Sequence, residues 1–217
     1  MAQMVTDTGK EEKAVKKPSA ASKRTQDKWK KKKWFKIFSP AEFEKREIGE
    51  TVGEKPKLLM NRIIRVNLGD LTAQRKKRHI YLSFCVNDIQ GTNAFTRVTG
   101  HHMIPSYVGR LVRRHNSKME VTRYLDLGAE GTMKVKAVAV SSRKLAQSQE
   151  TAIRNRMVQF LTEFGQGRPF GQIVQDFAFG TAANKLFDEI KSIAPLKRVE
   201  ISESALMGGE TGNDSGQ

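Results

Sequence analysis

Residues 118–141 read KMEVTRYLDLGAEGTMKVKAVAVS, and this stretch decides the fold. Apolar and polar residues alternate on both sides of the glycine-containing turn at 128–131, which is the period of half-buried β-strands. After the turn, Lys134 and Lys136 share one face. The stretch is therefore typical of two antiparallel strands joined in a hairpin.

Similar alternation elsewhere in the chain predicts further strands at 62–68, 78–86, 93–99 and 196–202. Apolar residues at helical spacing predict helices at 105–115, 147–164 and 181–194, with a short helical piece after 167–169. Because most strands precede most helices, the expected fold class is α+β. We expect an antiparallel, β-barrel-like core with helices packed in the C-terminal third, and a single α+β domain over 47–204.

Both ends of the chain are expected to be disordered. Residues 1–27 are rich in Lys, Ala, Ser and Thr and hold almost no large apolar side chains, which predicts a disordered basic tail. Residues 205–217 are expected to form a disordered acidic tail. Between the first tail and the domain, residues 28–46 form an arm rich in Lys and Trp. We expect 28–36 to order only on a polyanion, because its like charges repel one another.

The arm begins with KWKKKKWFK at 28–36, the strongest functional signal in the chain. Lysines at this density favour a polyanionic partner, and the interleaved rings can stack on bases. A membrane surface is the alternative, but the run is too short and too charged for a broad apolar face. Trp34 either stacks on a base or anchors the arm, and the apolar residues that follow it favour the anchor. The net charge of +16, from 39 Lys and Arg against 23 Asp and Glu, supports nucleic acid as the partner.

Three further clusters of cations could hold phosphates. The first is the loop at 75–78, whose alternative is a solvated surface loop. The second lies around the end of the helix at 105–115, where arginines also complement the helix dipole. The third combines Arg143 and Lys144 with Arg154 and Arg156. The predicted nucleic-acid-binding residues are Lys28, Trp29, Lys30, Lys31, Lys32, Lys33, Trp34, Lys36, Arg75, Lys76, Lys77, Arg78, Arg110, Arg113, Arg114, Arg143 and Lys144.

Signals of catalysis, metal binding and membrane insertion are weak. Cys85 is the only cysteine, which excludes an intramolecular disulfide and predicts a semi-buried structural thiol. His101 and His102 are adjacent and would point to opposite faces of a strand, so we expect surface or RNA-facing histidines rather than a metal site. Acidic residues are scattered singly. We therefore expect no enzyme activity, no cofactor, no signal peptide and no membrane partner.

The segment at 32–51, KKWFKIFSPAEFEKREIGET, resembles the N-terminal signature of the archaeal and eukaryotic small-subunit ribosomal protein family called 3Ae. That signature has a lysine run, a Trp-Phe pair, a Ser-Pro pair, a Phe and an Ile-Gly-x-Thr motif. The matching residues here are Trp34-Phe35, Ser39-Pro40, Phe43 and Ile48-Gly49-Glu50-Thr51. The block NDIQGTN at 87–93 is similar to a turn of the same family, and the resemblance covers 26–204. The short C-terminal end resembles the archaeal members.

The resemblance implies a structural constituent of the small ribosomal subunit, located in the cytoplasm. The barrel-like core would be seated near the platform and the mRNA exit. Its partners would be ribosomal RNA, neighbouring ribosomal proteins and mRNA at the exit. The alternative is a free RNA-binding translation or RNA-processing factor with an OB-like barrel. Association with small subunits that resists high salt favours the first function, and salt-labile association favours the second.

Overall fold

The computed structural model describes residues 28–207, which fall into two compact units, one ending at Lys31 and one beginning at Lys32. Of the first unit, only the 3-10 turn η2 (Lys28–Lys31) is described. All other elements belong to the second unit. The tails expected at 1–27 and 208–217 lie outside the described residues.

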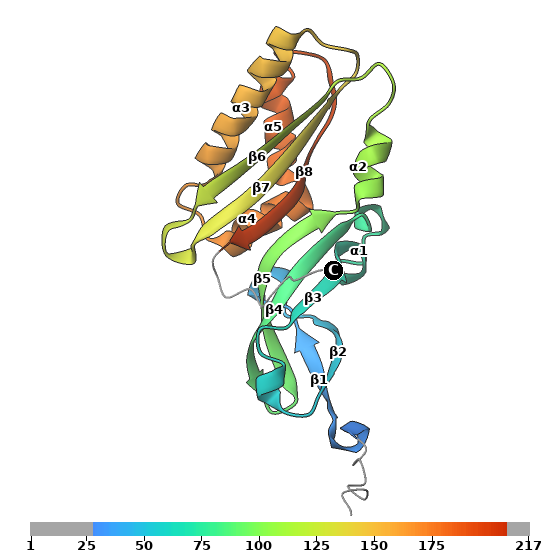
Figure 1. The fold of residues 1–217 in the computed structure, drawn as a ribbon, viewed down its shortest axis with the longest axis vertical. Helices are drawn as coiled ribbons and strands as arrows, with labels where there is room; N and C mark the ends of the chain where they lie inside the picture. The colour runs from blue at the N-terminus through green and yellow to red at the C-terminus, as the bar shows by residue number, and fades with distance from the viewer. Residues whose placement is uncertain (1–27, 208–217) are drawn as a thin grey trace, which may run out of the picture. The chain divides into compact units, whose positions relative to one another are not determined.

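Eight strands form one sheet in the described part of the chain (Figure 1). Their order is β2-β1-β5-β8-β7-β6, and β4 and β3 extend the sheet from the other side of β5. All pairs are antiparallel except β1 with β5. The strands are β1 (Lys33–Phe38), β2 (Glu47–Gly53), β3 (Ile63–Asn67), β4 (Ile80–Gln90), β5 (Asn93–Met103), β6 (Lys118–Asp126), β7 (Thr132–Ser141) and β8 (Leu196–Met207).

The sheet is open, so the α+β class is confirmed but the expected barrel-like core is corrected to an open sheet. The reason lies in β5, which changes its partner along its length. Residues 93–95 pair with β1, whereas residues 100–102 pair with β8. This change divides the sheet into two branches instead of closing it. Among the described residues, β2, β3 and β6 each pair on one side only.

The hairpin predicted at 118–141 is confirmed. β6 and β7 pair without interruption from Lys118↔Val140 to Asp126↔Thr132. Its apolar face is buried under the helices at Met119, Val121 and Leu125. The strand β8 lies on the other side of β7 and continues to Met207, so the acidic tail predicted from 205 is wrong for 205–207.

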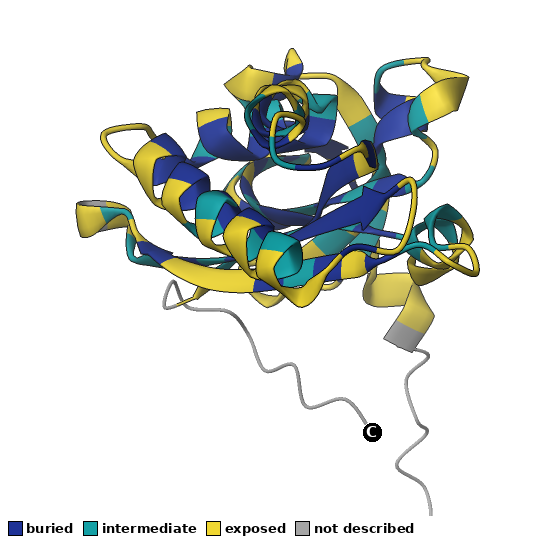
Figure 2. Cartoon of the chain, turned by 90° about the horizontal axis from the view of Figure 1, so that it is seen from above, coloured by how far each residue is buried: buried dark blue, intermediate teal, exposed yellow. Residues whose placement is uncertain are grey.

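Three helices cover one face of the sheet. Helix α3 packs on β6, α4 on β5 and α5 on β8, and buried residues concentrate where helices meet strands (Figure 2). The stripe of α3 that is predicted to be apolar is buried at Ile153, Met157, Phe160, Leu161 and Phe164. The helices are α1 (Leu68–Leu71), α2 (Pro105–Leu111), α3 (Gln147–Gly165), α4 (Phe170–Phe179) and α5 (Thr181–Ile190).

The residues that were candidates for chemistry are structural. His101 is 1% exposed, which corrects the prediction of a surface or RNA-facing histidine. Its Nε2 lies 3.0 Å from the carbonyl oxygen of Ile201 and its Nδ1 lies 2.6 Å from Ser204 Oγ. Since a carbonyl only accepts, Nε2 carries the proton and Nδ1 accepts from the hydroxyl, which is a complete set of bonds for neutral imidazole. Burial lowers the pKa of His101 from 6.5 to about 4. Cys85 is buried, as expected of a structural thiol.

The arm is partly a strand. Residues Lys33–Phe38 form β1, so the expectation that 28–36 has no structure without RNA is wrong for its second half. The side chains of Phe35 and Ile37 are buried, whereas the side chain of Trp34 is 65% exposed. Phe35 therefore anchors the arm, and the anchoring role favoured for Trp34 is wrong. The alternation of residues in KWFKI at 33–37 predicts that Phe35 and Ile37 lie on one face and Trp34 on the other, because every second residue of a strand points to the same side.

Candidate RNA interface

Ion pairs divide the cations of the protein into two groups. Arg154 on α3 lies 3.1 Å from Glu150, and Arg156 lies 2.9 Å from Glu189. These two arginines are neutralised within the protein, which separates them from the cluster predicted with Arg143. Cations without a carboxylate partner among the described residues are the better candidates for phosphate contacts.

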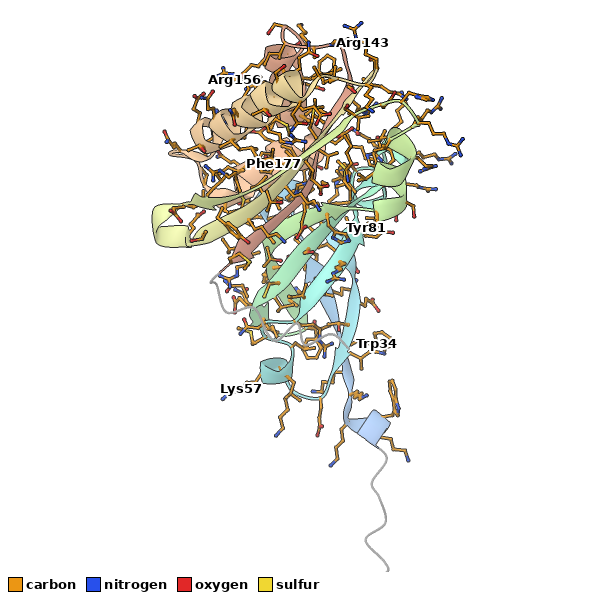
Figure 3. The ribbon with its side chains drawn as sticks, turned by 45° about the horizontal axis from the view of Figure 1, so that its top comes forward. Trp34, Lys57, Tyr81, Arg143, Arg156 and Phe177 are labelled. Atoms are coloured by element: carbon orange, nitrogen blue, oxygen red, sulfur yellow. The ribbon has the colours of Figure 1, made fainter. Side chains whose placement is uncertain are left out.

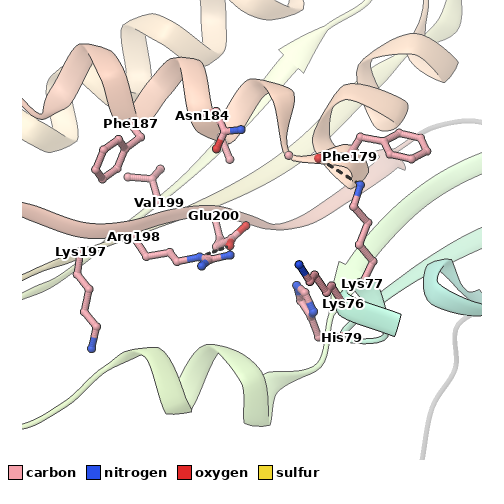
Figure 4. Close-up of a pocket in the computed structure, with 12 residues that line it drawn as sticks. Lys76, Lys77, His79, Phe179, Asn184, Phe187, Lys197, Arg198, Val199 and Glu200 are labelled. Carbon is pink, nitrogen blue, oxygen red and sulfur yellow. Dashed lines mark hydrogen bonds and ion pairs between the residues drawn. The ribbon is translucent and has the colours of Figure 1, made fainter. Parts of the chain in front are cut away.

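Several such cations line one open cavity of about 430 Å³, which we call the basic groove (Figure 4). It lies between the 3-10 turn η5 (Arg75–Lys77), the beginning of β8 and helix α5. Its basic lining residues, of which only Arg198 has a carboxylate partner within residues 28–207, come from two distant parts of the sequence. They are Lys76, Lys77, His79, Lys197 and Arg198.

One side of the basic groove is held in place by Lys77. Its Nζ lies 3.4 Å from the carbonyl oxygen of Phe179 and 4.1 Å from the centre of the Phe179 ring. This contact links the predicted loop at 75–78 to the end of α4. Burial lowers the pKa of Lys77, in keeping with its position against a ring. Lys76 and Arg75 remain exposed beside it.

The opposite side is organised by Arg198 and Glu200. The Arg198 Nε donates to Glu200 Oε1 over 2.7 Å, and this hydrogen bond raises the pKa of Arg198. Glu200 is the only carboxylate among the lining residues, and it is buried. Because Glu200 takes only the Nε of Arg198, the remaining guanidinium donors stay free to meet an anion.

Helix α2 does not line the basic groove but contacts it through His79. The rings of His79 and Tyr107 stack with centroids 3.8 Å apart, and Arg110 lies 6.0 Å from the Tyr107 centroid. This stack brings the predicted Arg110 next to the predicted loop at 75–78. Burial is the main cause that lowers the pKa of His79, and Arg198 and Arg110 lower it further, so His79 is neutral at pH 7.

A second cationic surface, the basic rim, comprises Arg113, Arg114, Arg143 and Lys144, all exposed. Two serines join the loops that carry them. The Ser117 N–H donates to Ser141 Oγ over 2.8 Å, and the Leu145 N–H donates to Ser117 Oγ over 3.1 Å. The Ser142 N–H also donates to the carbonyl oxygen of Pro195, two residues before Lys197 of the basic groove. Predicted clusters far apart in sequence thus lie along one continuous edge.

The arm lies elsewhere. Figure 3 shows Trp34 at one end of the second unit and Arg143 at the other. Lys33 is exposed, and Lys36 lies 3.4 Å from Glu47 in an exposed ion pair. Lys30 and Lys31 belong to the first unit and are exposed there. Within the second unit, the structure therefore does not bring Lys33, Trp34 or Lys36 into the basic groove or the basic rim.

Of the polar residues that line the basic groove, His79, Asn184, Lys197, Arg198 and Glu200 were not predicted from the sequence. Lys197 and Arg198 are adjacent cations at the start of the strand predicted at 196–202. This pair is a signal in the sequence that could have predicted a phosphate contact there. His79 and Asn184 have no such signal. Their place in the groove depends on contacts between β4, α2 and α5.

The fold and the distribution of charge indicate the class of protein to which this chain belongs. An open α+β sheet with unpaired cations gathered along one edge is typical of a protein that holds nucleic acid by its phosphates. In the described part of the chain, no group of three or more His, Cys, Asp or Glu side chains could hold a metal ion. No helix among residues 28–207 is long and apolar enough to cross a membrane.

The particular family follows from sequence comparison. The chain belongs to the Ribosomal S3Ae family, which it matches over residues 20–208. It is 31% identical over 188 residues to "Small ribosomal subunit protein eS1" of Methanothermobacter thermautotrophicus, covering 87% of this chain and 96% of that protein. It is 33% identical over 190 residues to the protein of the same name from Methanococcus vannielii, covering 87% and 86%. The chain is thus a ribosomal protein of archaeal type and not an enzyme.

Proposed function

We propose that this ribosomal protein binds ribosomal RNA through the basic groove and the basic rim. The chain is a structural constituent of the small ribosomal subunit, and its place is the ribosome in the cytoplasm. Its partners are ribosomal RNA and other ribosomal proteins. The alternative of a free factor with an OB-like barrel loses its structural basis, because the sheet is open.

One observation carries this proposal: cations from four separate parts of the sequence meet along one edge, and most of them have no carboxylate partner among the described residues. The loop at 75–78, the end of α2, the loop after β7 and the start of β8 all contribute. Two arginines at this edge are exceptions: Arg198 is bound to Glu200, and Arg78 lies 3.9 Å from Asp70 in an exposed ion pair. Such a surface repels itself unless phosphates neutralise it, and the release of counterions from RNA then favours binding.

We extend the proposal to the arm. Lys30, Lys31, Lys32 and Lys33 would contact phosphates, and Trp34 would stack on a base, because its ring is largely exposed on β1. The family resemblance supports a position near the platform and the mRNA exit, with mRNA as a further partner.

Charge reversal tests the proposal. The variant Arg75→Glu/Lys76→Glu/Lys197→Glu changes three exposed cations beside or in the basic groove and should be poorly incorporated into small subunits, as measured by co-sedimentation at high salt. The matched control Lys55→Glu/Lys57→Glu/Arg97→Glu makes the same change of net charge at exposed positions outside both surfaces. It should incorporate like the wild type. Equal loss in both variants would mean that binding depends on total charge alone, and no loss in the groove variant would overturn the proposal.

A further inference from the structure

We infer that the basic groove receives one unpaired nucleotide of RNA, with its base against the apolar wall and its phosphates on the cations. The inference rests on the proposed function and says which form of RNA the groove binds. A site for the backbone of a paired stem would need only the cations.

The groove has the size of a small-ligand site. Its volume of about 430 Å³ lies in the range of roughly 300–1,000 Å³ that is usual for pockets that enclose small molecules. A paired stem keeps its bases stacked inside the double helix, so it can contact only the opening of such a cavity. An extruded nucleotide can enter it, and most sequence-specific recognition of RNA uses bases exposed in this way.

The lining of the groove is divided by chemistry (Figure 4). On one side, Phe187 of α5 lies near Val199 of β8, whereas Lys76 and His79 lie on the other side. Phe187 is half-buried, with part of its surface packed against the hydrophobic core, and no other ring stacks on it among the described residues. Its ring can therefore stack on a base, a contact that any base can make.

Polar groups in the groove can position both ends of the nucleotide. Asn184 is exposed on α5, and its side-chain amide can both donate to and accept from the edge of a base. Arg198 is oriented by its bond to Glu200, so its terminal nitrogens are preorganised for phosphate. Lys197, adjacent to Arg198, and Lys76, on the opposite side, are exposed and can contact the neighbouring phosphates.

Fluorescence titration of the full-length protein tests the inference. The probes are a stem-loop RNA with a single bulged 2-aminopurine nucleotide and the same stem fully paired. We expect the bulged stem to bind about 5- to 150-fold more tightly, which corresponds to the roughly 1–3 kcal/mol for stacking of one base on an aromatic side chain. Its fluorescence should be quenched on binding. The variant Phe187→Leu keeps the apolar volume but removes the ring. It should lose this preference while its affinity for the paired stem is unchanged.

The matched control is Tyr124→Leu, which removes a 62%-exposed ring on β6 and should keep the preference. Equal binding of both stems by the wild type would overturn the inference and leave phosphate binding by the groove intact. Binding of neither stem, or a cross-link from the groove to a neighbouring protein in intact subunits, would also overturn it. The proposed function is decided separately, by the incorporation of the groove charge-reversal variant.

Discussion

Acidification should destabilise this protein through one buried side chain, His101. The folded protein holds its imidazole neutral with a pKa of about 4, because burial opposes the charged form, whereas the unfolded chain has the ordinary value of 6.5. Above pH 6.5 neither state binds the proton. As the pH falls from 6.5 to 4, the unfolded chain takes up a proton that the folded protein refuses, so the free energy of unfolding decreases.

The size of this effect follows from the two pKa values. A difference of one pKa unit corresponds to about 1.4 kcal/mol, so the shift from 6.5 to about 4 gives a loss of about 3 kcal/mol at full extent. Most of that loss should be complete at pH 4.5. Charged carboxylates elsewhere also titrate in this range, so the wild type alone cannot isolate the contribution of His101.

The comparison that isolates it is urea unfolding of the wild type and of His101→Gln at pH 7.5, 6 and 4.5. The variant has no titrating group at this position, so between pH 7.5 and 4.5 its free energy of unfolding should decrease by about 2.5 kcal/mol less than that of the wild type. His102→Gln serves as the control: its pKa is also lowered by burial, but it is only half-buried and should have a smaller effect. The same decrease with pH in wild type and His101→Gln would refute the reasoning. If the variant does not fold, NMR titration of His101 in the wild type must still give a pKa well below 6.5.

Three further predictions concern the fold and the RNA contacts. Gly100→Ala should reduce stability by about 3 kcal/mol, because the added Cβ would overlap the carbonyl oxygen of Ser204 across the β5–β8 pair. The control Gly109→Ala, at an open position of α2, should be neutral or slightly stabilising. Equal melting temperatures of the two variants would contradict this prediction. In urea unfolding, Phe35→Ala should lower the free energy of unfolding by about 3–5 kcal/mol, and Trp34→Ala should lower it by less than about 0.5 kcal/mol. A larger loss in Trp34→Ala than in Phe35→Ala would show that Trp34 is the anchor. Each exposed lysine of the basic groove changed to Ala should lower the slope of log affinity against log salt by about 0.7–0.9, and an unchanged slope would mean that the lysine does not touch phosphate.

The local parts of this fold are predictable from sequence. The alternation at 118–141 gives the β6–β7 hairpin, because neighbouring strands joined by a short turn depend on contacts close in sequence. The spacing of apolar residues at 147–164 gives α3 and its buried face for the same reason. Clusters of cations are also visible directly in the sequence, and three of the predicted clusters lie at the basic groove and the basic rim.

The remaining features depend on contacts between distant residues. The open sheet results from the change of partner along β5, and His101 is buried because Ser204, 103 positions away, pairs with it across two strands. Local alternation cannot indicate which strand will cover a given histidine. Likewise, Lys197 joins the loop at 75–78 only because β8 returns beside it, and the pairing of Arg156 with Glu189 follows from the packing of α3 against α5.

The most direct test of the account is a map of cross-links between this chain and ribosomal RNA in intact small subunits. We expect nucleotides attached to the peptides that contain 75–79, 110–114, 143–144 and 197–198, because these segments form the basic groove and the basic rim. The ion-paired outer side of α3, with Arg154 and Arg156, should carry none. Cross-links concentrated on α3, with none at the basic groove, would contradict the central claim.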